Sequence, residues 1–313
     1  MRKVTKEVVR RHPENPILTA DQFPWRVSSV YNSGCTKYKG RYILACRVNR
    51  LDMHTEIWLA DSDDGVRFTP RPDPLPMPET EDFRQFATHV VYDPRITYLA
   101  EEKRYLMTLA VHGDLGCRPA LFETKDWKTV RFLDWLSEVD NRNMVIFPEK
   151  IGGMYCRLDR PNVPGGHGKG NIWISWSPDL HFWGQSAIVL KAGQCGLFCH
   201  SGIGPCTVPH RTKEGWLVLF HGIMHSAGGC WYTLAATLLD PKDPSRVIAK
   251  TEYPILEPRA HYERHGLVPN VIFCCGAIYE DDGQVKIYYG AGDDTQCLAT
   301  STVDELIYAC KHQ

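Results

Sequence analysis

Hydrophobic residues along this chain fall into short runs rich in aromatic and β-branched side chains, and each run is closed by Gly, Asp, Asn or Pro. The clearest runs are RYILACRV, EIWLADS, RYLMTLAV, MYCRLDR, NIWISWS, WLVLFHG, WYTLAATLL and VKIYYGA. Runs of this kind, bounded by turn residues, are typical of β-strands. Helical periodicity is limited to residues 1–12 and to TVDELIYACKH near the C-terminus. The pattern therefore predicts an all-β protein with short helices at its two ends.

A longer repeat overlies the strands. A strand, a second strand and a polar turn closed by a hydrophobic residue recur in residues 39–68, 102–132, 152–183 and 214–248, and residues 282–307 close the series. The spacing of about fifty to seventy residues lies in the range where repeats indicate propeller blades or solenoids. We therefore predict a five-bladed β-propeller that occupies residues 1–313 as a single domain.

The recurring turns read SDDGVRF, TKDWKTVRF and SPDLHFW, and each places an acid ahead of a hydrophobic side chain. Aspartates in such turns accept hydrogen bonds from the backbone just after them, and the hydrophobic residue packs between blades. We therefore interpret Asp63, Asp126 and Asp179 as structural residues.

Composition narrows the function. The 313 residues are 43% hydrophobic and carry a formal charge of −1, so the chain lacks the basic excess expected of a nucleic-acid or membrane-surface protein. The basic N-terminus lacks the apolar segment of a secretory signal, and no apolar run is long enough for a spanning helix. We expect a cytoplasmic protein whose cysteines stay reduced.

Several familiar motifs are excluded. CGLFCHSGIGPCTVPH gathers cysteines and histidines, but it lacks the paired short spacings of a zinc site, so we predict no metal. PGGHGKGN lacks the Walker spacing, and we interpret its glycines as a loop passing close to a ligand, with His167 either a donor to that ligand or a structural histidine. No nucleophile elbow or recognisable cysteine nucleophile occurs.

Ligands of propellers bind in the central funnel, so polar residues that recur at strand ends are the candidates for a site. The segments LACRV, VYDPRI, RLDRPN, LFHGI and YGAGDD contribute Arg47, Asp93, Arg160, His221 and Asp293. One such group per blade predicts a shared pocket.

Two alternatives stay open at this level. Asp93 follows a hydrophobic strand and precedes Pro94 in HVVYDPRIT, which suits either a turn residue or a working acid. Arg142, Asn143 and Arg160 suit an anion site, because two guanidiniums and an amide can bind one anion, or they form ordinary surface ion pairs.

The motifs YDPRIT, NRNMVIFPEKIGGMYCRLDRP, IWISWSPDLHFWG, GWLVLFHGI, YERHGLVPNVIFCCGAI and IYYGAGDD resemble glycoside hydrolase family 130 over nearly the whole chain. This resemblance implies a five-bladed propeller and an inverting phosphorylase that cleaves β-linked mannosides with inorganic phosphate as co-substrate and no cofactor. It implies Asp93 as the single general acid, with its proton passing through the 3-hydroxyl of the mannosyl unit.

The resemblance also implies phosphate contacts from Arg142, Asn143, Arg160 and His221, and sugar contacts from Arg47, Tyr92, His167 and Asp293. The chain departs from the family before GIGP, where a lysine is usual and His200 or Ser201 stands instead. A protonated His200 would still donate to phosphate, whereas a neutral one would give a weaker anion site.

Three functions follow from these residues. The first is a β-mannoside phosphorylase, because phosphate is itself the nucleophile and the arginines have no obvious paired acid. The second is a phosphate-independent β-mannosidase, which needs a second carboxylate to activate water, with Glu149, Glu263 or Asp294 as its base. The third is a non-catalytic sugar-binding propeller. The linkage, the leaving sugar and the oligomeric state are left open by the sequence.

Overall fold

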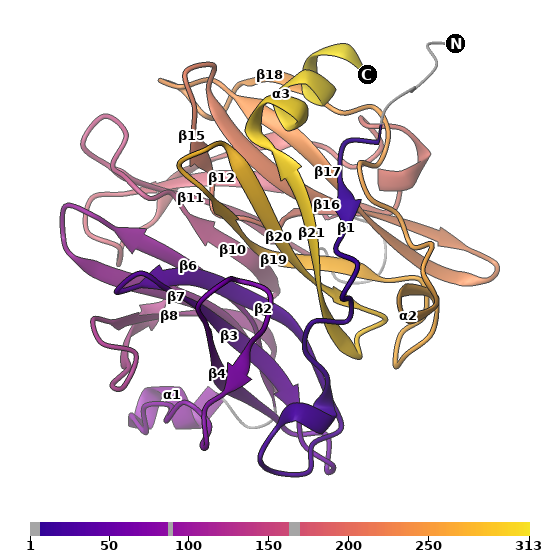
Figure 1. The fold of residues 1–313 in the computed structure, drawn as a ribbon. Helices are drawn as coiled ribbons and strands as arrows, with labels where there is room; N and C mark the ends of the chain where they lie inside the picture. The colour runs from indigo at the N-terminus through magenta and orange to yellow at the C-terminus, as the bar shows by residue number, and fades with distance from the viewer. Residues whose placement is uncertain (1–6, 87–89, 163–169) are drawn as a thin grey trace.

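Five antiparallel sheets surround a common axis in the computed structural model, which describes residues 7–86, 90–162 and 170–313 (Figure 1). Each sheet is one blade, and the innermost strand of each blade contacts the innermost strands of other blades around the axis. The five-bladed β-propeller predicted from the sequence is confirmed.

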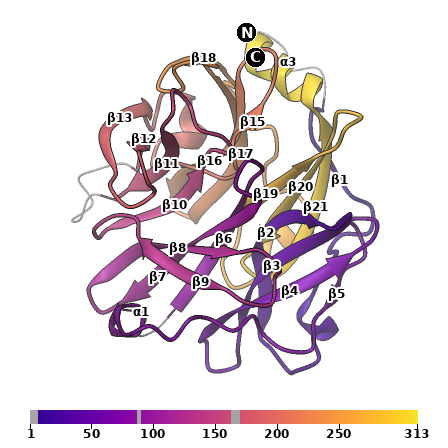
Figure 2. The same cartoon turned by 90° about the vertical axis from the view of Figure 1, so that its left-hand side faces the viewer.

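The strands of the blades have the following bounds. The first blade is β2 (Ser29–Tyr38), β3 (Arg41–Asn49), β4 (Thr55–Ser62) and β5 (Thr69–Pro70). The second is β6 (Val90–Leu99), β7 (Arg104–Gly113), β8 (Gly116–Thr124) and β9 (Arg131–Trp135). The third is β10 (Asn141–Ile146), β11 (Tyr155–Pro161), β12 (Ile172–Ser177) and β13 (Gly184–Leu190), beside the second in Figure 2. The fourth is β14 (Gly202–Pro205), β16 (Trp216–Ser226), β17 (Gly229–Leu239) and β18 (Val247–Lys250), with β15 (His210–Arg211) paired to β16.

The fifth blade joins the two ends of the chain. It consists of β19 (Ile272–Tyr279), β20 (Gln284–Ala291), β21 (Thr295–Thr302) and the N-terminal β1 (Arg10–Arg11). β1 pairs antiparallel with β21, so that Arg10 lies opposite Thr300 and Arg11 opposite Ala299. The helix predicted for residues 1–12 is therefore wrong over the described residues, because pairing with a free sheet edge outweighs a weak helical pattern.

The C-terminal helix is confirmed as α3 (Val303–His312). The hydroxyl of Thr302 caps it by accepting a hydrogen bond from the Glu305 N–H at 3.1 Å. The sequence pattern missed two short helices, α1 (Glu81–Phe86) and α2 (His261–Arg264), and the 3₁₀ turns η1 (Ala20–Gln22) and η3 (Leu197–Cys199). None of the described helices has the length and apolar character needed to cross a membrane.

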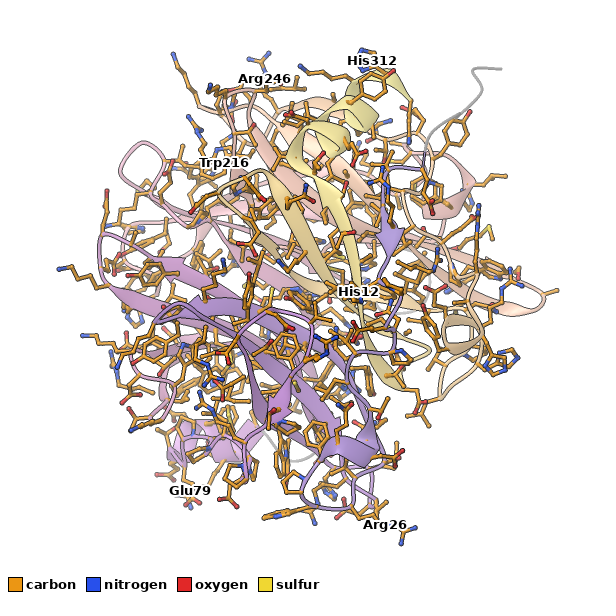
Figure 3. The ribbon with its side chains drawn as sticks, in the orientation of Figure 1. His12, Arg26, Glu79, Trp216, Arg246 and His312 are labelled. Atoms are coloured by element: carbon orange, nitrogen blue, oxygen red, sulfur yellow. The ribbon has the colours of Figure 1, made fainter. Side chains whose placement is uncertain are left out.

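The core lies between blades as well as within them, and side chains fill the space between neighbouring sheets (Figure 3). One cluster joins Ile43 and Leu59 of the first blade to Met107 and Phe122 of the second. Trp127, which lies in the second blade's recurring turn, is fully buried in the same cluster. This packing fixes the angle between blades and therefore the spacing of the strands that face the axis.

The structural role predicted for the acids of the recurring turns is confirmed for Asp126 and Asp179, but not for Asp63. Asp126 Oδ1 accepts from the N–H groups of Lys128 and Thr129 at 2.9 Å, and Asp179 Oδ1 accepts from those of His181 and Phe182 at 2.9 Å.

In the first blade this role belongs to Asp64, whose Oδ1 accepts from Val66 and Arg67 at 2.8 and 2.9 Å, and not to Asp63. Asp63 instead forms an exposed ion pair with Arg41. In each turn the structural acid comes two residues after a Ser or Thr whose hydroxyl oxygen accepts a hydrogen bond from a backbone N–H of the same turn. Asp64 has this spacing from Ser62, whereas Asp63 does not.

The strands next to the axis share a backbone irregularity that positions the site. The register of β2, β6, β10 and β19 shifts by a β-bulge. In three of these bulges a polar residue adopts a left-handed backbone conformation: Asn32 (φ 49°), Asp93 (φ 53°) and Asn143 (φ 59°). Asn and Asp tolerate this conformation better than other side-chain-bearing residues, and bulges redirect side chains near active sites.

Candidate active site

A cavity of about 430 Å³ opens at the axis where these bulges meet. Such a volume suits a small ligand rather than a macromolecule. It is lined by Asn32, Arg47, Val90, Tyr92, Asp93, His112, Arg142, Asn143, Arg160, Cys230, Tyr232, Val268, Val271, Phe273 and Asp293. All five blades or the loops between them therefore contribute to one hollow.

Asp93 is a buried carboxylate in this cavity, with one of its oxygens held in place. Oδ1 accepts hydrogen bonds from Asn32 Nδ2 at 3.0 Å and from Arg47 NH1 at 3.1 Å. Within the described part of the chain Oδ2 has no hydrogen bond to protein, so it is the oxygen left to carry or release a proton toward a ligand. The backbone carbonyl of Asp93 accepts from Arg95, which stiffens the bulge.

Arg47 lies between two aromatic rings. Its guanidinium carbon lies 4.5 Å from the ring centre of Tyr31 and 4.8 Å from that of Tyr92. The two rings and Asp93 leave this guanidinium a single orientation, and its buried Nε has no partner among the described residues. Arg47 therefore binds Asp93 while it lines the cavity.

Three further guanidiniums gather near Asp93. Arg95 is buried behind the cavity and donates to Asn143 Oδ1 at 3.3 Å. Arg142 and Arg160 line the cavity on adjacent strands and lie opposite each other in the β10–β11 register. Burial, and then the positive charge of Arg142, lower the pKa of Arg160 to about 10.

This cluster has more positive charge than its neighbours neutralise. Asp140 lies 3.9 Å from Arg142, and Asn162 binds the same guanidinium at 3.0 and 3.1 Å when its amide oxygen faces it. The buried Arg160 Nε and Asn143 Nδ2 have no partner among the described residues. An anion in the cavity would offset the repulsion between the guanidiniums that line it.

His221 lies behind Arg160 rather than in the cavity. It is fully buried, and its Nε2 is 3.0 Å from Arg160 NH1. Burial and then the charge of Arg160 hold the pKa of His221 well below its usual value, so the ring is neutral. His221 comes from the second strand of its blade and reaches inward because its strand partner is Gly204. A Cβ at Gly204 would lie 2.6 Å from His221 Cε1 and 2.9 Å from Asn143 Nδ2.

A second carboxylate lines the cavity on the side of Arg47. Asp293 stands at φ 51° in the hairpin between β20 and β21. Burial raises its pKa to about 6, with Arg47 opposing the shift and Asp93 adding to it. Asp293 is therefore a second carboxyl group in the cavity, with a pKa raised well above that of an ordinary aspartate.

Most of the predicted site residues lie together, and the exceptions are specific. Arg47, Tyr92, Asp93, Arg142, Asn143, Arg160 and Asp293 line the cavity. His200 is exposed at the end of η3 and does not line it, because the turn that follows η3 leaves that side chain on the surface. His167 lies outside the described residues.

The acids suggested as a hydrolytic base do not line the cavity either. Glu149 is exposed in the loop between β10 and β11. Glu263 is fully buried, but its oxygens are taken by Arg11 and by the Arg259 and Ala260 N–H groups. Asp294 is next to the cavity residue Asp293 in sequence but does not face the hollow.

Sequence reasoning missed Asn32, Arg95, His112 and Tyr232. Asn32 had a usable signal, since SVYNSG in β2 and VVYDPR in β6 place Asn32 and Asp93 at matching positions. For His112 and Tyr232, which are ordinary strand residues in the sequence, we find no comparable signal. The described residues contain no group of three or more His, Cys, Asp or Glu placed to hold a metal ion.

The fold and the cavity together define the class: a propeller enzyme with an acid and a cluster of cations in its central funnel. Comparison with known proteins identifies the family. The family model described as beta-1,4-mannooligosaccharide phosphorylase matches residues 2–312. The chain belongs to this family, glycoside hydrolase family 130, as its sequence motifs predict.

Individual relatives agree with this assignment. A beta-1,4-mannooligosaccharide phosphorylase of Ruminococcus albus is 32% identical over 96% of this chain and 90% of its own. A beta-1,2-mannobiose phosphorylase of Listeria innocua is 34% identical over 80% of this chain and 68% of its own. The solved complex of beta-1,2-mannobiose phosphorylase from Listeria innocua superimposes with a TM-score of 0.88 at 28% identity, covering 97% of this chain and 99% of that one. The predicted enzyme class, a glycoside phosphorylase of the mannoside type, is confirmed.

Proposed function

We propose that this protein cleaves β-linked mannosides with inorganic phosphate and releases α-mannose 1-phosphate with inversion at the anomeric carbon. The observation that carries the proposal is the pair of guanidiniums, Arg142 and Arg160, that line the same cavity as the Asp93 carboxylate, with Arg95 buried behind them. A phosphate bound there would offset the repulsion between these guanidiniums. The family and its characterised relatives support the same reaction.

In this proposal Asp93 is the general acid. Its proton passes through the 3-hydroxyl of the mannosyl unit to the glycosidic oxygen, and the bond between that oxygen and the anomeric carbon breaks. An oxygen of phosphate forms the new bond to the opposite face of the same carbon. Asn32 and Arg47 keep the carboxyl group in one orientation by binding Oδ1.

Phosphate would be held by Arg142, Asn143 and Arg160. Guanidinium groups bind phosphate through paired, charge-assisted hydrogen bonds, and the low dielectric of a cavity strengthens them. Arg95 supports this set by donating a hydrogen bond to the amide oxygen of Asn143 from behind. His221 acts on phosphate only through Arg160 in this arrangement.

The mannosyl unit would lie against Arg47, Tyr92 and Asp293. The two relatives described above act on different linkages, β-1,4 and β-1,2, so the proposal covers β-mannosides as a class. The linkage depends on contacts to the leaving sugar at the rim of the cavity.

Hydrolysis is the reaction that Asp293 would permit, because an inverting hydrolase needs a second carboxylate roughly 6.5–9.5 Å from the acid to activate water. Phosphorolysis is favoured because the guanidinium cluster has no use in hydrolysis and because the relatives are phosphorylases. A non-catalytic sugar-binding protein would need neither the acid nor the anion pocket.

The test is incubation of the purified protein with β-1,4-mannobiose and β-1,2-mannobiose, each with and without inorganic phosphate, followed by NMR detection of the products. Phosphate-dependent α-mannose 1-phosphate is the expected result. Free mannose formed at the same rate without phosphate would replace the proposal with hydrolysis, and no turnover of either sugar would contradict it.

A further inference from the structure

Cys206 is the residue that connects the guanidinium cluster to the core between the fourth and fifth blades. It follows β14 directly and is fully buried. Its sulfur lies 3.4 Å from His221 Nδ1, and its carbonyl oxygen accepts from Arg95 Nε at 3.3 Å. One residue outside the cavity therefore binds the guanidinium of Arg95 directly and contacts His221, the neighbour of Arg160.

The direction of each hydrogen bond follows from what the groups are able to donate. A guanidinium has donors only, so His221 Nε2 accepts from Arg160 NH1. The neutral ring then carries its proton on Nδ1, which faces the Cys206 sulfur. Burial raises the pKa of the Cys206 thiol to about 12, so the sulfur accepts this hydrogen bond as a neutral thiol.

This arrangement excludes the two forms of His221 that cannot accept a hydrogen bond from Arg160. The other tautomer of His221 would point a proton at Arg160, and a protonated ring would add a charge next to Arg160, Arg95 and Arg142. The groups that face His221 include Arg160, Cys206, Tyr232 and Phe273, with Gly204 opposite it in the strand pair. None of these is an acid that would stabilise a protonated ring.

We propose that Cys206 is a positioning residue for the anion site: its sulfur holds His221 in the tautomer that accepts from Arg160, and Arg160 is thereby aimed into the cavity. The inference rests on the proposed function in that the anion is inorganic phosphate. Cys206 touches neither sugar nor phosphate, so it acts only through His221 and Arg160.

The test compares Cys206→Ala with Cys206→Ser and with Cys310→Ala. Cys310 is buried in the same hydrophobic cluster but belongs to α3, which makes Cys310→Ala a matched loss of a buried thiol. Binding of inorganic phosphate to each free protein is measured by calorimetry, and the KM for phosphate and kcat by phosphorolysis. Calorimetry reports on the inference even where the protein has no phosphorolytic turnover.

Cys206→Ala should raise the Kd and KM for phosphate about tenfold, the usual effect of losing one supporting hydrogen bond, while kcat at saturating phosphate stays within about twofold. Cys206→Ser should recover most of the affinity, because its hydroxyl also accepts from Nδ1–H. Cys310→Ala should bind phosphate like the wild type. An unchanged Kd in Cys206→Ala, an equal loss in Cys310→Ala, or a failure of serine to restore binding would overturn the inference.

A measurement on the wild type keeps the inference testable if Cys206→Ala does not fold. Nitrogen-15 NMR of histidine-labelled protein identifies the His221 tautomer, with the resonance assigned by its loss in His221→Gln. A neutral ring protonated at Nδ1 is the expected result, and a ring protonated at Nε2 would overturn the inference. Wild-type phosphate binding without phosphorolysis would contradict the proposed function alone.

Discussion

Asp93 owes its place in the cavity to a backbone conformation that few residues adopt. Its φ of 53° in a β-bulge directs the side chain to the axis rather than to either face of the sheet. Asn32 and Asn143 adopt the same backbone conformation in the neighbouring blades. A left-handed residue costs of order 1 kcal/mol or more, and the hydrogen bonds from Asn32 and Arg47 offset that cost for Asp93.

Asp93→Asn tests the acid directly. The amide oxygen still accepts from Asn32 and Arg47, but no proton is available, so turnover should fall by about 10²–10⁴-fold. The melting temperature should stay within a few degrees of the wild type, since asparagine tolerates the same backbone conformation. Steady-state rates and circular dichroism are the measurements, and wild-type rates in a folded variant would contradict the assigned role.

Asp293→Asn tests the raised pKa of Asp293. The folded protein retains the Asp293 proton up to about pH 6, whereas the unfolded chain loses it near pH 4, so wild-type stability falls as pH rises through this window. The free energy of unfolding of the variant should not decrease over this pH range. At pH 7 it should exceed that of the wild type by about 1–2 kcal/mol, after allowance for solvent screening.

Urea unfolding of Asp293→Asn and wild type at pH 4.5 and pH 7 is the measurement, with the exposed Asp63→Asn as control. Identical pH dependence in Asp293→Asn and wild type would show that the carboxyl is not perturbed.

Gly204→Ala tests whether the absence of a side chain at position 204 is needed to accommodate the ring of His221. The added methyl would lie 2.6 Å from His221 Cε1, so the ring must move and Arg160 with it. We expect the KM for phosphate to rise about tenfold, with a loss of about 1–3 kcal/mol of stability from overpacking. Gly184→Ala on β13, where a Cβ meets nothing within 4 Å, is the control and should change neither quantity. An unchanged KM for phosphate in Gly204→Ala would contradict this account.

At the scale of the element, the recurring turns stabilise each blade and pack it against its neighbour. The acid at the recurring turn accepts from two successive N–H groups, and this lowers the pKa of Asp64 to about 2 and also lowers the pKa values of Asp126 and Asp179. A hydrophobic residue then packs between blades, as Trp127 does. The turn chemistry therefore belongs to the fold, and the function depends on the bulges in the innermost strands.

Asp64→Ala and Asp63→Ala form a matched pair of neighbouring substitutions. Asp64→Ala removes two hydrogen bonds to turn N–H groups and should lower the free energy of unfolding by about 1–2 kcal/mol. Asp63→Ala removes only an exposed ion pair and should change it by less than about 0.5 kcal/mol. Urea unfolding is the measurement, and an equal loss of free energy of unfolding in the two variants would contradict the assignment of the structural role to Asp64 rather than Asp63.

At the scale of the whole molecule, the ring of blades is closed where the N-terminal and C-terminal parts of the chain form one sheet. β1 completes the fifth blade, and Arg11 binds both oxygens of the fully buried Glu263 at 2.8 Å. Because that carboxylate also accepts from two N–H groups before α2, the ion pair connects the first strand to the loop that leads to β19. Closure fixes the distances across the axis, and the cavity depends on them.

Arg11→Ala should therefore destabilise the fold by about 3 kcal/mol, because it leaves a buried carboxylate without its counter-charge. Arg10→Ala, on the same strand, removes a more exposed pair with Glu305 and should cost less than about 1 kcal/mol. Thermal and urea unfolding of the two variants is the measurement. A loss in Arg11→Ala no greater than in Arg10→Ala would show that closure does not depend on this pair.

The sequence by itself determined the strands, the turns and the repeat, because each is encoded in a few neighbouring residues. It also identified Asp93, Arg47, Arg142, Asn143, Arg160 and Asp293, which the structure brings to one cavity, since unusual polar residues at strand ends are visible without coordinates. The choice of Asp63 instead of Asp64 was wrong because the acid is selected by its spacing from Ser62, which the pattern of acids alone does not reveal.

Only the tertiary structure decided which side chains meet across the axis. It paired β1 with β21, set His221 behind Arg160, left His200 on the surface and added Asn32 to the carboxylate of Asp93. These contacts join residues that are far apart in the chain, and their distances are fixed only when the blades pack and the ring closes. Local preference selects the elements, whereas the geometry of the closed ring determines which polar groups share one low-dielectric hollow.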